Sequence, residues 1–270
     1  QRQMCIRDRN MYLIPQPKNI EFGEPDSHFT LSYESYVVLE PSCGEKLTAQ
    51  AKLAVEALKE ELGFAPALTR GTGRPGDVIL SQSEAMAPQS YRLTVDEKNV
   101  CITGGEAGVW YGCQTLLQMA AQCGAVLPAI TIEDEPDIPN RGFYHDITRG
   151  RVPKMSFLKK MADKMAYYKM NQLQLYIEHT FLFRDFSEIW RDDTPLTAAE
   201  ILELDRYCAE RGIELVPSLS CFGHLYKVLS SQGYSYLCEL EDSEKMPFSL
   251  RGRMHHLSLI HISEPTRPEP

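Results

Sequence analysis

The sequence predicts an α/β protein in two parts: a small N-terminal α+β sandwich over residues 11–135, then over residues 141–256 the first βα units of a (β/α)8 (TIM) barrel. In the first part, strand-like apolar runs accompany two helical patterns, which is typical of a sheet with helices on one side. In the second part, short apolar strands alternate with helices, as in parallel βα units with both faces covered. Such units build either a doubly wound sheet or a (β/α)8 barrel, and polar residues after every strand favour the barrel. Because such a barrel takes roughly 250 residues, the sequence predicts a barrel truncated to about three units.

The N-terminal part opens with a strand and a helix. Residues 33–39 are rich in β-branched and aromatic side chains and are predicted as a strand. Apolar residues recur at helical spacing over residues 47–62, and Gly63 stands where a C-cap glycine ends a helix. Residues 78–80 form a short apolar run that predicts a buried strand.

A hairpin and a second helix complete this part. Residues 91–95 and 100–103 alternate between apolar and polar side chains around a polar turn, which predicts a hairpin. Gly104 and Gly105 then lead into a helical pattern over residues 109–120. The glycines do not make a phosphate-binding motif, so a tight strand-to-helix turn is the preferred interpretation.

A linker and three strands are predicted after the N-terminal part. Residues 132–140 contain two prolines and have the composition of a linker. Strands are predicted at residues 142–147, 173–177 and 213–217.

Two helices are predicted between these strands. The first is predicted to begin with Ser156 as its N-cap. Its expected apolar positions are Phe157, Leu158, Met161, Met165 and Tyr168, and its expected solvated lysines are Lys159, Lys160, Lys164 and Lys169. The second helix opens with a capping box formed by Thr197 and Glu200, and Gly212 is predicted to end it.

Polar side chains follow each of the three predicted strands. They are His145, Asp146 and Arg149 after the first, Glu178 and His179 after the second, and Ser218, Ser220 and His224 after the third. In a barrel these positions form the mouth, where active sites lie.

The composition restricts the partners of the protein. The 270 residues carry a formal net charge of -9, which disfavours nucleic acid and favours a neutral or cationic small substrate. No apolar run approaches the roughly 20 residues of a membrane span.

The eight cysteines form no CxxC pair, so they are interpreted as small buried hydrophobes in a reducing compartment.

Both ends of the chain look non-native. Residues 1–10 and 257–270 follow neither a helical nor a strand period, so Met11 is the expected natural start. No secretory signal is visible near the start, which predicts a cytoplasmic protein.

Motifs from both parts of the chain occur in the order found in one known family. They are YRLTV at 91–95, ITGG at 102–105, VWYGCQTLLQ at 109–118, IEDEP at 132–136, RGFYHDITR at 141–149, KMNQLQL at 169–175, GIELVP at 212–217 and GH at 223–224. Together they resemble family 20 of the glycoside hydrolases, the β-N-acetylhexosaminidases. The resemblance covers essentially residues 11–256.

The resemblance implies removal of a terminal β-linked N-acetylglucosamine or N-acetylgalactosamine without a metal or other cofactor. The nucleophile in this family is the acetamido oxygen of the substrate itself. A Glu acts as general acid and base beside an Asp that orients the acetamido group. That pair lies after the fourth barrel strand, so it is expected beyond this chain, and the chain itself is expected to be inactive.

The resemblance also implies sugar-binding residues. Arg149 matches the arginine that grips the outer hydroxyls of the sugar, although an ion pair with Asp146 is the alternative. His224 matches the Gly-His pair after the third strand, with a core histidine as an equal alternative. Independently of the resemblance, Trp190 in the loop after the second predicted strand is expected either to stack on a sugar face or to pack its own loop. Glu178 and His179 complete the predicted substrate-binding set.

Two departures from the family pattern point to a divergent branch. Ser220 stands where the family commonly has an Asp, and residues 176–181 replace its usual His-x-x-Asp-Asp stretch. A metal-dependent barrel hydrolase is an alternative function, with His145, Asp146, Glu178, His179 and His224 as ligands. A glycan-binding protein without the catalytic acid is the other alternative.

Overall fold

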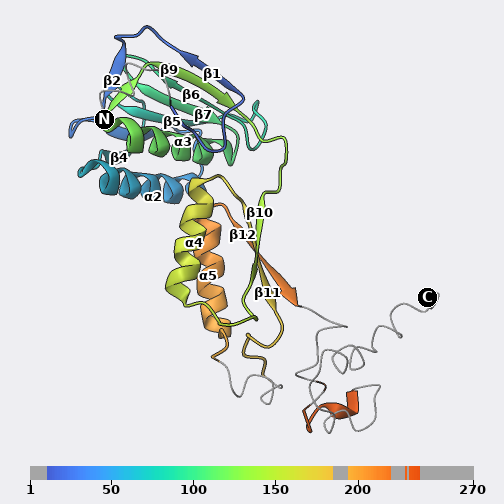
Figure 1. The fold of residues 1–270 in the computed structure, drawn as a ribbon. Coiled ribbons are helices and arrows are strands. Elements are labelled where there is room, and N and C mark those ends of the chain that lie inside the picture. Colours follow the sequence, from blue (N-terminus) through green and yellow to red (C-terminus); the bar gives the residue numbers. More distant parts are fainter. Residues whose placement is uncertain (1–10, 185–193, 220–228, 230, 238–270) are drawn as a thin grey trace, which may run out of the picture. The chain divides into compact units, whose positions relative to one another are not determined.

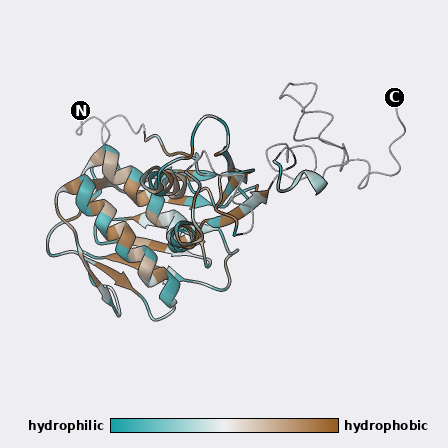
Figure 2. Ribbon diagram, turned by 90° about the horizontal axis from the view of Figure 1, so that it is seen from below, coloured by the Kyte–Doolittle hydropathy of each residue, from teal (hydrophilic) through white to brown (hydrophobic). Residues whose placement is uncertain are grey.

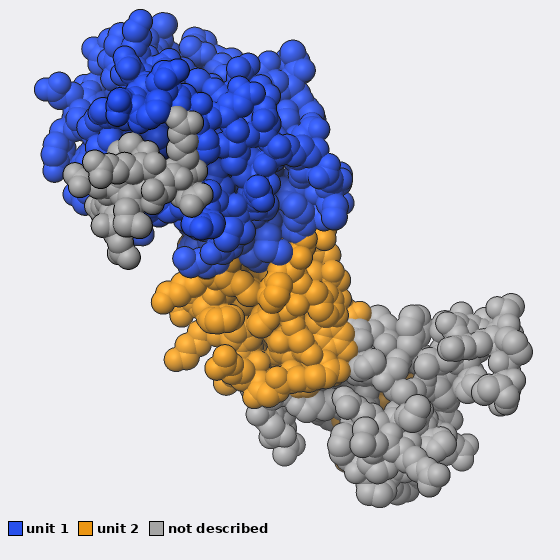
Figure 3. All heavy atoms as spheres, turned by 45° about the horizontal axis from the view of Figure 1, so that its top comes forward, with its two compact units in different colours: residues 1–141, 163–171, 210–213 blue, residues 142–162, 172–209, 214–270 orange. Residues whose placement is uncertain are grey.

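The chain forms two compact units in the computed structural model, which describes residues 11–184, 194–219, 229 and 231–237. Figure 3 colours the two units separately. Unit 1 contains Gln1–Arg141, Asp163–Asn171 and Glu210–Ile213, and unit 2 contains Gly142–Ala162, Gln172–Ala209 and Glu214–Pro270. Among the described helices, none has the length and apolar character that crossing a membrane requires.

Unit 1 is built on a mixed seven-stranded sheet of order β1-β9-β6-β7-β5-β3-β4 (Figure 1). Its strands are β1 (Asn19–Phe22), β3 (Tyr36–Leu39), β4 (Ala67–Arg70), β5 (Val78–Gln82), β6 (Tyr91–Val95), β7 (Val100–Gly104) and β9 (Ile130–Asp134). The short strands β2 (His28–Thr30) and β8 (Val126–Pro128) pair separately and antiparallel. The predicted strands and the β6–β7 hairpin are confirmed, although β3 begins three residues later than the predicted run.

Two helices cover one side of this sheet, as the sequence predicts (Figure 1). They are α2 (Glu45–Leu62) and α3 (Gly108–Cys123). Gly63 ends α2 in the left-handed region at φ 79°, and its N–H donates to Lys59 O, so the predicted C-cap is confirmed. Figure 2 shows hydrophilic and hydrophobic residues alternating along the helices, as expected for helices with one buried face.

The predicted linker at residues 132–140 is wrong in its first part. Ile132 is fully buried, and the segment up to Asp134 belongs to β9, which pairs with both β1 and β6. The alternation of Ile130 and Ile132 with polar residues was the signal for a half-buried strand. The acidic residues and prolines that follow give the segment the composition of a linker, and the strand is therefore missing from the prediction.

Unit 2 contains three parallel strands in the order β10-β11-β12. They are β10 (Gly142–Asp146), β11 (Gln172–Ile177) and β12 (Glu214–Leu219), in agreement with the prediction. The helices α4 (Met155–Tyr167) and α5 (Ala198–Glu210) lie between them in the sequence, and η2 (Ser235–Leu237) is a short 3-10 helix. The capping box is confirmed, since Glu200 N donates to Thr197 Oγ1 at 3.2 Å and Thr197 N donates to Glu200 Oε2 at 2.8 Å.

Two predictions about α4 are wrong. The helix begins at Met155, so Ser156 is inside it, and the carbonyl of Lys154 accepts the first helical hydrogen bond. Phe157 and Tyr168 are exposed rather than buried. Ala162 and Ala166 are buried instead, because small residues let the buried side of the helix approach its neighbours closely.

The expectation that both faces of the parallel strands are covered is also not met in the described part of unit 2. Leu173 and Leu175 in the central strand are buried, but Phe143, Tyr144 and Leu219 in the outer strands are exposed. Apolar side chains of this size ordinarily lie under a further layer.

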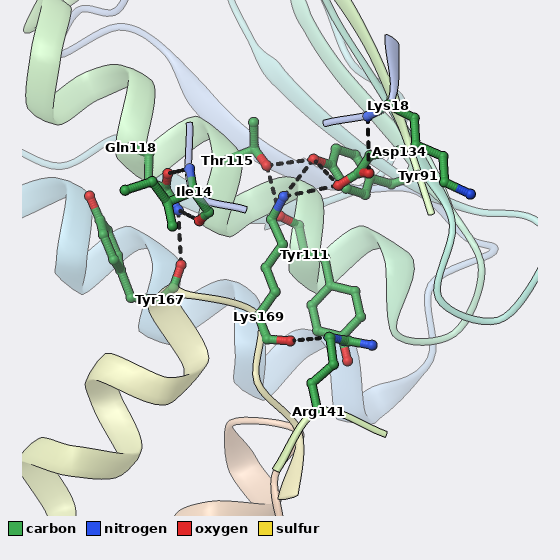
Figure 4. A network of polar contacts seen from close by, with 10 residues as sticks. All are labelled: Ile14, Lys18, Tyr91, Tyr111, Thr115, Gln118, Asp134, Arg141, Tyr167 and Lys169. Carbon is green, nitrogen blue, oxygen red and sulfur yellow. Dashed lines mark hydrogen bonds and ion pairs between the residues drawn. The ribbon is translucent and has the colours of Figure 1, made fainter. Parts of the chain in front are cut away.

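Lys169 was predicted to be solvated and is buried in unit 1 (Figure 4). Its ammonium group lies 3.2 Å from Asp134 Oδ2 and donates to the hydroxyl of Tyr91 at 2.8 Å. Only 5% of the Lys169 side chain and 14% of the Asp134 side chain are exposed. Burial lowers the pKa of Lys169, and Asp134 opposes that effect. Burial, with the charge of Asp134, also raises the pKa of Tyr91.

The backbone at Lys169 is unusual as well. Its φ of 59° lies in the left-handed region, where the turn that ends α4 would ordinarily favour glycine. The lysine at this position adopts that backbone conformation while its side chain contacts Asp134 and Tyr91. The Lys169 carbonyl accepts a hydrogen bond from Arg141 Nε at 2.9 Å, and the Arg141 guanidinium lies 5.2 Å from the Tyr111 ring (Figure 4).

Polar side chains of α3 hold further backbone segments of unit 1. Gln118 donates to the carbonyls of Ile14 and Tyr167 at 2.8 and 3.0 Å and accepts from Ile14 N at 2.8 Å. Trp110, which is buried, donates to the carbonyl of Arg211 at 2.9 Å. A helix of the N-terminal part therefore binds the ends of α4 and α5 that belong to the same unit.

We expect Lys169→Met to lower the free energy of unfolding by about 3 kcal/mol, because it leaves the buried Asp134 carboxylate without its partner. Replacing both partners, as Lys169→Met with Asp134→Leu, should be less destabilising than either change alone. Denaturant unfolding followed by circular dichroism measures both effects.

The control for this prediction is Lys46→Met, which removes a lysine from an exposed ion pair with Glu106 in the same unit. Exposed pairs contribute about 0–1 kcal/mol. Equal losses for the Lys46 and Lys169 variants would show that burial of the Lys169 pair has no special energetic weight.

Candidate functional site

The register of the parallel strands decides which polar residues of unit 2 meet. Asp146 of β10 is paired with Tyr176 of β11, so their side chains leave the sheet on the same face. His145 leaves on the other face, where its ring lies 5.9 Å from the Phe143 ring and 6.0 Å from the Phe157 ring of α4. His145 and Asp146 therefore point to opposite faces of the sheet.

Arg149 lies between two carboxylates that come from different strands. Its Nη1 donates to Asp146 Oδ2 at 2.7 Å, and its Nη2 donates to Glu178 Oε1 at 3.0 Å. Both ends of the guanidinium fork are thus held, one from the end of β10 and the other from the end of β11. About half of the Arg149 side chain, 49%, remains exposed.

Tyr176 contacts both Arg149 and Glu178, and with Asp146 these residues form what we call the Arg149 cluster. The Arg149 guanidinium carbon lies 5.1 Å from the centre of the Tyr176 ring, a cation–π distance. The Tyr176 hydroxyl donates to Glu178 Oε1 at 2.6 Å. The same carboxylate oxygen therefore accepts from both Arg149 and Tyr176, and the Glu178 side chain is 10% exposed.

Hydrogen bonds at the end of β10 set the ionisation of the cluster. Burial alone would raise the pKa of Asp146, but donors from the Thr148 hydroxyl, the Thr148 backbone and Arg149 outweigh it and lower that pKa to about 2. The side chains of Tyr176 and Asp146 raise the pKa of Arg149. One guanidinium and two carboxylates meet here, so the cluster carries a formal charge of −1.

The other predicted site residues are placed less fully. His179 is largely buried, and its Nδ1 lies 3.9 Å from Glu178 Oε2, beyond hydrogen-bond distance. Trp190, Ser220 and His224 lie outside the described residues. Of the predicted substrate-binding set, the structure brings Arg149 and Glu178 into direct contact, with His179 beside them.

The proposed metal site does not assemble in the described part of the chain. Within those residues no three His, Cys, Asp or Glu side chains are close enough together to hold a metal ion. His145 faces α4, whereas Asp146 and Glu178 both accept hydrogen bonds from Arg149. The arrangement instead presents a guanidinium with planar donors, which suits the hydroxyl or carbonyl oxygens of a ligand.

Tyr176 and Asp146 are the residues that sequence reasoning assigned too little importance. In the sequence, Tyr176 stands out only as a departure from the family pattern. Asp146 stands out as a polar residue after the first strand, a candidate metal ligand and a possible ion-pair partner of Arg149. The period of two residues in a strand places Tyr176 and Glu178 on the same face, and this was the available signal. The register between β10 and β11 could not be read from one sequence.

The N-terminal part of the chain matches a protein-family model. Residues 10–135 match the model described as glycosyl hydrolase family 20, domain 2. Among curated proteins, a β-hexosaminidase of Akkermansia muciniphila is 31% identical over 212 residues, which is 70% of this chain and 41% of that protein. A β-hexosaminidase of Vibrio furnissii is 27% identical over 240 residues, or 78% of this chain and 38% of that protein.

Solved structures share the fold. An exo-β-N-acetylglucosaminidase of Vibrio harveyi in complex with N-acetylglucosamine matches with a TM-score of 0.70 and 20% identity, over 85% of this chain and 39% of that one. A β-N-acetylhexosaminidase of Streptomyces coelicolor matches with a TM-score of 0.70 and 23% identity, over 81% of this chain and 48% of that one. The chain thus spans less than half the length of these relatives.

We expect the Asp146 carboxylate to stabilise the folded chain only above its titration range. Because its pKa is lower in the folded state, about 2, than its ordinary value of 3.8, the contribution is complete above about pH 4 and is lost as the pH falls toward 2. Asp146→Asn should therefore unfold with a shallower pH dependence between pH 2 and 4. Urea unfolding of both proteins across this range tests it, and parallel slopes would contradict the assigned hydrogen bonds.

Proposed function

The chain belongs to glycoside hydrolase family 20, and from this we propose that the whole protein is a β-N-acetylhexosaminidase. It would remove terminal β-linked N-acetylglucosamine or N-acetylgalactosamine from a glycan. The match of residues 10–135 to a domain model of this family is the observation that carries the proposal. The guanidinium at the carboxyl ends of β10 and β11 supports it from the other unit.

We propose that β10, β11 and β12 are the first strands of a (β/α)8 barrel. Their parallel order supports this, as do the exposed apolar side chains of Phe143, Tyr144 and Leu219, which further barrel elements would cover. The domain division then follows the sequence prediction, with an N-terminal domain at residues 11–135 and the barrel beginning at residue 141.

The proposed reaction is substrate-assisted hydrolysis with retention. The acetamido oxygen of the substrate attacks the anomeric carbon while a general acid protonates the departing glycosidic oxygen. The bond from the anomeric carbon to that oxygen breaks, and an oxazolinium ring forms. Water then opens the ring and gives up its proton to the same carboxylate. The carboxylate pair for this chemistry is not assigned to a residue of this chain.

Arg149 is the proposed sugar-binding residue of the described part. Its guanidinium is half exposed at the ends of β10 and β11, where ligands bind in barrels. Its planar donors can contact two neighbouring hydroxyl oxygens at once. His179, His224 and Trp190 stay in the proposed binding set, His224 on the family resemblance alone and Trp190 because an aromatic ring can stack on a sugar face. The proposed partner is an oligosaccharide with a terminal N-acetylhexosamine, in the cytoplasm.

We expect the whole protein to cleave a chromogenic β-N-acetylglucosaminide and to cleave the matching β-glucoside at least about 100-fold more slowly. The glucoside has the same sugar ring but lacks the acetamido oxygen that acts as nucleophile, so it cannot react by the proposed mechanism. Initial rates on the two substrates decide this. Equal rates would require an enzymatic nucleophile and would contradict the proposal.

Replacing Arg149 by Ala in the whole protein should lower kcat/KM by about one to two orders of magnitude. Hydrogen bonds to a charged group are worth about 1.5–3 kcal/mol. Arg149→Lys should recover only part of the loss, because an ammonium group cannot reproduce the planar fork.

Arg92→Ala is the control, since Arg92 forms an exposed ion pair with Glu133 in unit 1. Its kcat/KM should stay near the wild-type value. A large drop in Tm for Arg149→Ala with near-normal kcat/KM in the folded protein would instead make Arg149 a purely structural ion-pair partner.

A further inference from the structure

We propose that Glu178 is a positioning residue for Arg149, and that Glu178 and Asp146 together make this site select an uncharged sugar ring over an anionic one. The proposal rests on the proposed function, in which Arg149 contacts the substrate. It changes the role of Glu178, which the sequence assigned to direct substrate binding.

The contacts of Glu178 are directed within the protein. Its Oε1 accepts from Arg149 Nη2 at 3.0 Å and from the Tyr176 hydroxyl at 2.6 Å. Its side chain is 10% exposed, compared with 49% for Arg149. Arg149 is therefore the member of this pair that a ligand can reach, and Glu178 acts on the ligand through it.

Three groups fix the orientation of the Arg149 guanidinium. Asp146 holds Nη1, Glu178 holds Nη2, and the ring of Tyr176 lies beneath the guanidinium carbon. An arginine that is already ordered loses less rotamer freedom when it binds a ligand. Removing Glu178 frees one end of the fork, so the binding of a neutral ligand should weaken although Arg149 itself remains.

The charges of the cluster point to selection by charge. An arginine without carboxylate partners attracts anions and pairs with them bidentately. Here two carboxylates outnumber the one guanidinium, so an incoming anion meets a net negative cluster. A neutral hydroxyl can still accept a hydrogen bond from the exposed part of the fork without that repulsion. His179 is the further titratable group beside Glu178 and adds charge only when it is protonated.

The test compares Glu178→Gln with Glu178→Ala in the whole protein. Inorganic sulfate and N-acetylglucosamine are the competitive inhibitors, at constant ionic strength and about pH 8, where imidazoles are ordinarily neutral. Glutamine keeps an oxygen acceptor for Arg149 and Tyr176 but removes the negative charge. We expect sulfate to inhibit Glu178→Gln about tenfold more tightly than the wild type.

The alanine variant should raise KM and the inhibition constant of N-acetylglucosamine about tenfold with a smaller change in kcat, and glutamine should recover most of that loss.

Glu203→Gln is the matched control, because it removes one carboxylate of an ion pair with Lys159 on the helical side of unit 2. Its inhibition constants should equal those of the wild type. If Glu178→Gln and Glu203→Gln bind sulfate equally, the selection by charge is wrong. If Glu178→Ala lowers Tm but leaves KM unchanged, the positioning role is wrong. Should Glu178→Gln fail to fold, Asp146→Asn removes a charge from the same guanidinium and must tighten sulfate binding likewise.

Failure of the proposed function can be distinguished from failure of this proposal. A wild-type protein that does not cleave a β-N-acetylglucosaminide contradicts the function. Calorimetric titration of sulfate and N-acetylglucosamine into the same variants then still measures the charge preference. Tighter sulfate binding by Glu178→Gln supports the proposal in that case, and unchanged sulfate binding contradicts it.

Discussion

The buried ion pair between Lys169 and Asp134 is the interaction on which the construction of unit 1 depends. A lysine with 5% of its side chain exposed keeps its charge only where a carboxylate compensates it, and Asp134 at the end of β9 is that carboxylate. The turn after α4 must therefore lie against the end of β9 and the start of β6, where Asp134 and Tyr91 are paired. The segment Asp163–Asn171 accordingly belongs to unit 1, although it follows β10 in the sequence.

A second constraint, the register of parallel strands, acts in the same way on unit 2. Because Asp146 is paired with Tyr176, and Glu178 follows two residues later, three side chains reach the same face as Arg149. A shift of β11 by one residue in this register would place Leu175 or Ile177 opposite Asp146 and turn Tyr176 and Glu178 to the other face. The candidate site therefore depends on backbone pairing more than on any single side chain.

Local patterns predicted most of the elements, and the misplaced residues have separate causes. The α2 cap at Gly63, the β6–β7 hairpin and the Thr197 capping box each follow from neighbours in the sequence. Lys169 was misplaced because its partner is 35 residues away and its own helix pattern puts it among lysines. Ile132 was assigned to a linker because the prolines after it dominate the local composition. The Arg149 cluster was predicted in part, since Arg149 and Glu178 each follow a predicted strand, but their contact depends on a register that one sequence does not contain.

Each of the two polar clusters combines a cation, a tyrosine ring and carboxylate, and the clusters differ in burial. This difference separates a structural role from the proposed binding role. In unit 1 an ammonium group lies over the Tyr91 ring and pairs with Asp134, and in unit 2 a guanidinium lies over the Tyr176 ring and pairs with Asp146 and Glu178. The first cation is almost wholly enclosed, so its hydrogen bonds can serve only the fold. The second is half exposed, and a planar guanidinium has more donors than its two carboxylates occupy. Because its partners already hold it in place, the exposed donors of Arg149 are ordered without a ligand, and this order lowers the entropic cost of the proposed binding of a neutral sugar.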